Sequence, residues 1–357
     1  VQAMPVNGSG MSLSNYSQVL LRNSDLLEAE FPLLVNLPAD NLISEYIDLY
    51  PQASISTFTN NFEQYQGVTK RYHPKVKTGF AAHYLTDIKH DLVILAFPKS
   101  KAELAFTLAM LSGCLTQDAQ ILIVGEKNGG IKSSPKLIKD YLSDYQKIDA
   151  ARHCMLFCGT FIQGLPPFNL DDWYKYYSIE IQGINLEIAA LPGVFSQEGL
   201  DKGTDILLHH LPETMTGKVL DFGCGAGIIA GLIGKKYSDI DLTLVDVSAL
   251  ALKSSEKTLS INNLAGTYLA SNSLSEIKGK YQHIVSNPPF HQGIKTHYGA
   301  TESFLEGIRT HMQPGASIHI VANSFLRYRP IMEKAIGKTE IICQEKGFTI
   351  YQCRRNK

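Results

Sequence analysis

Hydrophobic positions fall into two alternating patterns over most of the chain. Runs that are apolar on successive residues are typical of strands buried on both faces of a sheet, and three of them are Lys218–Phe222, Leu242–Asp246 and His283–Ser286. Segments with apolar residues every three or four positions follow these runs and predict helices over Ile228–Lys236, Ala249–Asn262 and Thr301–Met312. This alternation predicts an α/β fold built on a doubly wound, mainly parallel sheet.

Elements on either side extend the pattern. Tyr177–Ile188 alternates polar and apolar residues around Gly183 and predicts a hairpin. Three further strands are predicted near the carboxyl end, at Ser317–Val321, Glu340–Cys343 and Phe348–Cys353. In the first half, the same rules predict strands at Asp91–Phe97 and Gln120–Val124 and helices at Lys101–Leu111 and Leu137–Tyr145.

A chain of 357 residues is long for one core and predicts two domains. We expect a vector-derived tail over residues 1–10, an N-terminal domain over 11–162, a linker rich in Gly, Pro and Asp over 163–172, and a C-terminal domain over 173–357. The halves share an order of strand, turn, helix and strand, with Phe97-Pro98 where the second half has Asn287-Pro288. This order fits an internal duplication and a merely shared architecture equally well. A duplicated first half would have lost its chemistry, because it has no Gly-rich loop.

The segment VLDFGCGAG carries the most specific signal for a ligand. Asp221 lies in its strand, and Gly223, Gly225 and Gly227 let the chain turn sharply and let a ligand approach the backbone. Asp246 ends the next predicted strand, about 20 residues on, where a carboxylate can accept hydrogen bonds from ribose hydroxyls. The loop also fits a dinucleotide pattern. However, the carboxylate of Asp221 would repel a pyrophosphate and suits a cationic methionine end, so we predict S-adenosylmethionine rather than a nicotinamide.

The strand at His283–Ser286 runs out into the motif Asn287-Pro288-Pro289-Phe290. The prolines remove two N–H donors, which leaves the side-chain oxygen of Asn287 and the carbonyl of Pro288 as acceptors. A planar –NH₂ group needs two such acceptors, and bonding both hydrogens would turn its nitrogen lone pair toward a methyl donor. Phe290 supplies a face on which a ring can stack. We therefore predict that Asn287, Pro288 and Phe290 carry methyl transfer to an exocyclic amino group.

A second candidate lies upstream, where Leu191–Thr204 clusters Gly, Ser and Asp before the apolar Ile206–Leu208. This pattern predicts a loop and a helix cap. The loop could also serve as a lid over cofactor and target, with Phe195 as a second stacking face. The sequence leaves both interpretations open.

Together these motifs resemble a known family. The stretches PGVFS, DFGCGAG, DVS and SNPPFHQG, with SQVLLRNSD near the start and VGEKNGGIKS in the middle, are similar to those of the bacterial small-subunit (16S) ribosomal RNA guanine-N2 methyltransferases of the RsmC type. The resemblance covers nearly all of the chain after Met11. It implies two tandem Rossmann-like methyltransferase domains, of which the N-terminal one is degenerate and only the C-terminal one binds S-adenosylmethionine.

The resemblance also implies a role for each site residue. The methionine portion of the cofactor would lie against three glycines, Gly223, Gly225 and Gly227. Asp246 would hold the ribose, and Asn272 the adenine edge, where many methyltransferases have an acidic residue. Asn287 and Phe290 would hold the target, one guanine of 16S rRNA within the assembled 30S subunit.

Alternatives remain, because the N-P-P-F motif serves any planar amino group. They are a methyltransferase acting on N6 of adenine or on a protein glutamine amide, and a non-catalytic RNA-binding factor of ribosome assembly. The additional N-terminal domain favours a large RNA substrate over a small one. Its cationic patch lies beside a flexible Asn-Gly-Gly loop and is predicted to contact RNA or to form a solvated helix face: Lys132, Lys136 and Lys139.

The composition limits the classes of partner that we expect for this chain. The formal net charge is −1, so RNA would be held by local basic patches rather than by a field over the whole molecule. The sequence has no apolar run long enough to span a bilayer and no pattern of a signal peptide, so we expect a cytoplasmic protein without a membrane partner. We also expect a monomer. The only closely spaced cysteines, Cys154 and Cys158, have no second pair, so we expect no metal site.

Overall fold

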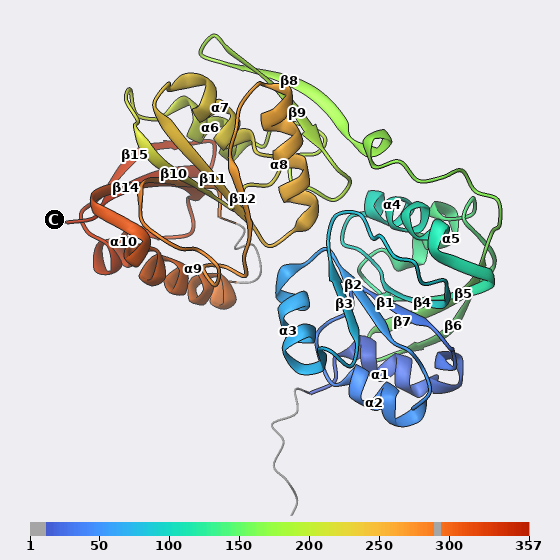
Figure 1. Ribbon diagram of the computed structural model, residues 1–357. Helices are drawn as coiled ribbons and strands as arrows, with labels where there is room; N and C mark the ends of the chain where they lie inside the picture. Colours follow the sequence, from blue (N-terminus) through green and yellow to red (C-terminus); the bar gives the residue numbers. More distant parts are fainter. Residues whose placement is uncertain (1–11, 289–293, 357) are drawn as a thin grey trace, which may run out of the picture. The chain divides into compact units, whose positions relative to one another are not determined.

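The structure is a computed structural model that describes residues 12–288 and 294–356. These residues form two compact units, one ending at Asp172 and the other beginning at Trp173, and each contains a seven-stranded sheet within its described part (Figure 1). We call them the N-terminal and C-terminal units.

The N-terminal unit alternates strands and helices from its start. Its elements are α1 (Asn15–Arg22), β1 (Pro32–Val35), α2 (Leu42–Leu49), β2 (Ser56–Thr59), α3 (Phe62–Tyr72), β3 (Lys77–Phe80), β4 (His90–Ala96), α4 (Lys101–Leu111), β5 (Leu115–Glu126), α5 (Ser134–Leu137), β6 (Leu142–Ala151) and β7 (Cys154–Phe161). The strand order is β3-β2-β1-β4-β5-β7-β6, in which β7 is antiparallel to both its neighbours. Both faces of this sheet are buried, because Leu92 and Ile94 of β4 pack toward α1, α2 and α3 while Val93 and Leu95 pack toward α4.

The C-terminal unit repeats this architecture after a hairpin. Its elements are β8 (Lys175–Ile181), β9 (Ile184–Ala190), α6 (Lys202–His209), β10 (Gly217–Phe222), α7 (Ile228–Lys236), β11 (Ile240–Asp246), α8 (Ala249–Ile261), β12 (Thr267–Ala270), β13 (Tyr281–Ser286), α9 (Ile294–Ile308), β14 (Met312–Asn323), α10 (Arg329–Ala335), β15 (Thr339–Glu345) and β16 (Phe348–Arg354). The strand order is β12-β11-β10-β13-β14-β16-β15. The two sheets therefore match strand for strand, which confirms the predicted fold class and fits both a duplication and a shared architecture.

Helices and a hairpin pack against the sheet of the C-terminal unit. Ile318 and Ile320 of β14 share a core with Phe304 and Leu305 of α9 and with Met332 of α10. The hairpin β8–β9 packs on α7 and α8. Burial of these apolar side chains holds the helices against the sheet and leaves the loops at the carboxyl ends of the strands free to bind ligands.

Most predicted elements are confirmed within a few residues, including α4 and α7, whose bounds match the predictions. The helix predicted over Leu137–Tyr145 is wrong: α5 ends at Leu137 and β6 begins at Leu142. The spacing of its apolar residues suits a helix locally, but Leu142 pairs with Phe161 in β7, a contact that local periodicity does not reveal. The predicted helix over Thr301–Met312 instead runs from Ile294 to Ile308 and is followed by a 3₁₀ turn.

Candidate active site

Four adjacent strands of the C-terminal unit bring the predicted cofactor residues to one edge of the sheet. The Gly-rich loop follows β10, Asp246 ends β11, and Asn272 lies just after β12. Asn287 follows β13, on the other side of β10. Asp246 lies opposite Ala270 in the β11–β12 register, so the loop carrying Asn272 starts beside it.

The Gly-rich loop has a backbone that other residues adopt at a cost. Gly223, Gly225 and Gly227 have φ angles of +71°, +53° and +78°. A Cβ on Gly227 would lie 3.0 Å from the backbone of Ser255, whereas a Cβ on Gly225 would meet no described atom closer than 3.8 Å. Gly227 is thus required for packing against α8, and Gly225 leaves an open face for a ligand.

Two carboxylates, those of Asp221 and Asp246, stabilise the loop by accepting hydrogen bonds from backbone N–H groups. Asp221 is fully buried, and its Oδ2 accepts a hydrogen bond of 3.0 Å from the N–H of Ala230 in the first turn of α7. Burial raises the pKa of Asp221 to about 7. Asp246 accepts from the N–H groups of Gly225 at 3.0 Å and Ser248 at 2.9 Å, and burial raises its pKa too. Both carboxylates therefore order the turn between β10 and α7.

The orientation of Asn287 is set by residues from far away in the sequence. Its Nδ2 donates to Thr204 Oγ1 at 3.0 Å and makes a longer contact of 3.4 Å with Asp201 Oδ2. A carboxylate oxygen can only accept, so the amide nitrogen faces these residues and Oδ1 faces away. Asp201 also caps α6, since the same Oδ2 accepts from the N–H groups of Gly203 and Thr204. The predicted helix cap is confirmed.

A cavity of about 280 Å³ opens beside this amide. Asp201, Asn287 and Pro288 line it together with Phe195, which is 53% exposed. The remaining walls are largely apolar and come from β14, the segment after it and β16: Val321, Ala322, Asn323, Leu326, Tyr328 and Phe348. Phe290, the other predicted stacking residue, lies outside the described residues.

Comparisons with known proteins match both units. The model of the methyltransferase small domain matches residues 185–352, and that of its N-terminal domain matches residues 17–177. Ribosomal RNA small subunit methyltransferase C of Colwellia psychrerythraea is 55% identical over 96% of this chain and 98% of its own. The chain belongs to the ribosomal RNA small subunit methyltransferase C family. The family predicted from the motifs is thereby confirmed, as is the class of enzyme.

More distant members agree with this assignment. The methyltransferase C of Aliivibrio salmonicida is 38% identical over 97% of this chain and all of its own. A solved structure of the T. thermophilus 16S rRNA N2 methyltransferase RsmC, in complex with AdoMet and guanosine, has a TM-score of 0.77. It covers 93% of this chain and 91% of its own at 21% identity, and so shows the fold alone.

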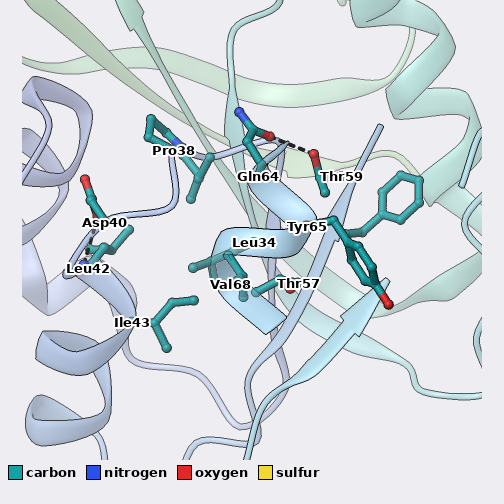
Figure 2. A pocket seen from close by; sticks show the side chains of 12 residues that line it. Leu34, Pro38, Asp40, Leu42, Ile43, Thr57, Thr59, Gln64, Tyr65 and Val68 are labelled. Carbon is teal, nitrogen blue, oxygen red and sulfur yellow. Dashed lines mark hydrogen bonds between the residues drawn. The ribbon is translucent and has the colours of Figure 1, made fainter. Parts of the chain in front are cut away.

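In the N-terminal unit, the position equivalent to the Gly-rich loop has almost no open space for a ligand. The turn after β1 contains Leu37, Pro38 and Asp40 instead of glycines, and β2 ends in Thr59 where β11 ends in Asp246. Figure 2 shows Pro38, Asp40 and Thr59 among the side chains that line this region, where the cavity measures only about 20 Å³. Small-molecule sites usually enclose about 300–1,000 Å³.

Some features of this family member were missed by sequence reasoning. Asp201 and Thr204 were recognised as a cap but not as partners of Asn287, which is more than 80 positions away. The predicted RNA patch, Lys132, Lys136 and Lys139, is exposed. A second basic segment was overlooked: residues 64–86 contain no acid and include the exposed Lys70, Lys75 and Lys77. A count of charge in a sliding window would have found it.

The described part of the chain lacks two kinds of feature. None of its helices is long and apolar enough to cross a membrane. Its described His, Cys, Asp and Glu side chains form no cluster that could hold a metal ion.

Proposed function

We propose that this chain transfers a methyl group from S-adenosylmethionine to the exocyclic N2 amino group of a guanine in 16S ribosomal RNA. The observation that carries the proposal is the orientation of Asn287, whose amide nitrogen is held by Thr204 and Asp201 while its oxygen is left for a ligand. Family membership and the likeness to a methyltransferase in complex with AdoMet and guanosine support the same activity.

The residues at the strand ends fit S-adenosylmethionine. Asp221 Oδ1 is buried without a hydrogen-bond partner among the described residues, so a cationic ligand nearby would offset the cost of that charge. The open face of Gly225 suits the methionine portion, with Gly223 and Gly227 shaping the turn. Asp246 and Asn272 would hold the ribose and the adenine edge. When bound, this cofactor supplies a methyl group attached to a positively charged sulfur. After the transfer, the sulfur is part of a neutral thioether, which is a good leaving group.

The chain itself contributes acceptors and alignment. Asn287 Oδ1 and the carbonyl of Pro288 accept the two amino hydrogens, which localises the nitrogen lone pair for attack. Phe195 and Phe290 stack on the base from the lid and from the motif. The amino proton leaves to water after the new N–C bond forms, because neither acceptor is a strong base. Alignment of this kind can supply about 7–11 kcal/mol of the barrier.

We further propose that the assembled 30S subunit is the substrate, and that the enzyme works as a monomer in the cytoplasm. The N-terminal unit would then support the catalytic unit and bind RNA through Lys132, Lys136 and Lys139. Their ammonium groups are exposed and have no ion-pair partner within the described residues, which suits contacts with phosphate.

Methyl transfer to 30S subunits tests the proposal. We expect tritium from labelled S-adenosylmethionine to enter 16S rRNA, and mass spectrometry to find N2-methylguanosine at one position. Asn287→Ala should lower turnover about 10²–10³-fold while cofactor affinity changes little, because one acceptor for the amino group is lost. Recovery of N6-methyladenosine or of a methylated glutamine would contradict the choice of guanine. Unchanged turnover of the variant would contradict the role of Asn287.

A further inference from the structure

Asp201 has one carboxylate oxygen to which no described residue donates a hydrogen bond. Its Oδ2 receives the N–H groups of Gly203 and Thr204 and the longer contact from Asn287. No described residue donates to Oδ1, and Asp201 lines the cavity beside Asn287. Asn287, whose amide oxygen is the proposed acceptor for an amino group, and Asp201, with its unused oxygen, therefore line the same cavity.

The bases that carry an exocyclic amino group differ in what stands beside that group. In guanine, the N2 amino group is next to N1–H, which is a donor. The amino group of adenine is flanked by the bare acceptors N1 and N7, that of cytosine by N3, and that of a glutamine amide by its own carbonyl oxygen. An acceptor-only carboxylate placed beside the amino-group acceptor would bond to guanine and repel the other three.

We infer that Asp201 accepts the N1–H of the target guanine and so selects guanine over other amino acceptors. This inference rests on the proposed function and names the residue that sets its specificity. Asp201 then has two tasks: Oδ2 holds Asn287 and the start of α6, and Oδ1 reads the base. Because one side chain does both, the amide that binds N2 and the oxygen that binds N1–H keep a fixed spacing.

The substitution Asp201→Asn separates these tasks. The capping N–H groups of Gly203 and Thr204 still require an oxygen, so the amide oxygen takes the place of Oδ2 and the –NH₂ group faces the cavity. The variant therefore presents a donor where the wild type presents an acceptor. Asp201→Ser is the second variant, since serine is also a good helix N-cap but offers the base no carboxylate.

The probes are guanosine and 2-aminopurine riboside, measured as competitive inhibitors of tritium transfer to 30S subunits. Both carry the 2-amino group, but 2-aminopurine has a bare N1 acceptor instead of N1–H. We expect the wild type to bind guanosine about 10- to 100-fold more tightly, the range of a well-placed base contact. Asp201→Ser should bring the ratio close to one, and Asp201→Asn should bring it to one or below. Melting temperature and cofactor affinity serve as controls for folding.

The outcomes are distinct. A wild-type enzyme that does not favour guanosine, or variants that keep the wild-type ratio, would overturn the assignment of Asp201 while leaving guanine methylation intact. A wild-type enzyme that transfers no methyl group to N2 of a guanine would instead overturn the proposed function. If both variants fail to fold, the wild-type ratio still decides whether the site reads N1–H at all.

Discussion

Thr204 offers the sharpest test of how the site positions Asn287. It is 4% exposed, and its Oγ1 makes the 3.0 Å hydrogen bond that holds the amide nitrogen; the other contact, to Asp201, is 3.4 Å long. Thr204→Val keeps the shape of the side chain and removes this acceptor. A hydrogen bond of this kind contributes about 0.5–1.5 kcal/mol. Since about 1.4 kcal/mol is tenfold in rate, we expect the rate of methyl transfer to fall by about two- to tenfold.

Single-turnover tritium transfer to 30S subunits measures this rate directly. Thr204→Ser keeps the hydroxyl and should behave like the wild type, and cofactor affinity should be unchanged in both variants. Because Thr204 acts through Asn287, adding Thr204→Val to an Asn287→Ala enzyme should cause no further loss. A valine variant as fast as the wild type, or a serine variant as slow as valine, would refute this reasoning. Additive losses in the double variant would mean that Thr204 supports only the fold.

Further predictions concern the cofactor, the two basic segments and acid stability. Gly225→Ala places a methyl group on the open face of the loop and should weaken S-adenosylmethionine binding, measured by calorimetry. In the same experiment the wild type should bind one cofactor per chain. Two bound cofactors per chain would show that the N-terminal unit is not degenerate. Reversing three charges by substitution with Glu at Lys132, Lys136 and Lys139 should weaken 30S binding and reduce its salt dependence, and the same change at Lys70, Lys75 and Lys77 is the matched comparison within the unit. If only the second set matters, RNA binds at the segment around Lys70, Lys75 and Lys77 instead. His319 is 4% exposed, and burial lowers its pKa to about 4. Its unfolded pKa is about 6.5, so the unfolded chain binds the proton more readily, and stability should fall by up to about 3 kcal/mol as pH drops from 6.5 to 4. Urea titrations should show a smaller fall for His319→Leu.

The parts of the site that sequence could predict are those that consecutive residues encode. Gly223, Gly225 and Gly227 signal a tight turn by their type and spacing, and the motif starting at Asn287 signals acceptors because its prolines lack N–H groups. Both motifs follow apolar runs, and parallel strands end at a common edge, so their meeting could also be anticipated.

The features that the sequence could not predict depend on contacts between segments far apart in the chain. The bond between Asn287 and Thr204 joins the residue after β13 to the first turn of α6, and no periodicity encodes it. The same holds for β6, whose pairing with β7 overrides a locally helical spacing. The basic segment around Lys70, Lys75 and Lys77 is different, because its lack of acidic residues can be read directly from the sequence.

The two units differ in how the carboxylates near their first strand ends are hydrogen-bonded. In the N-terminal unit, Asp40 follows β1, and both of its oxygens are used: Oδ2 accepts from the N–H of Ser14 and the hydroxyl of Ser17, and Oδ1 accepts from the N–H of Leu42. In the C-terminal unit, the buried Asp221 leaves Oδ1 without a partner among the described residues. A buried unpaired carboxylate oxygen destabilises a fold unless a ligand compensates it. The N-terminal unit therefore satisfies the carboxylate of its turn internally, while the C-terminal unit keeps a buried carboxylate oxygen without a described partner. Introducing glycines after β1 alone should therefore not create cofactor binding, because the bonds of Asp40 would still hold that turn closed.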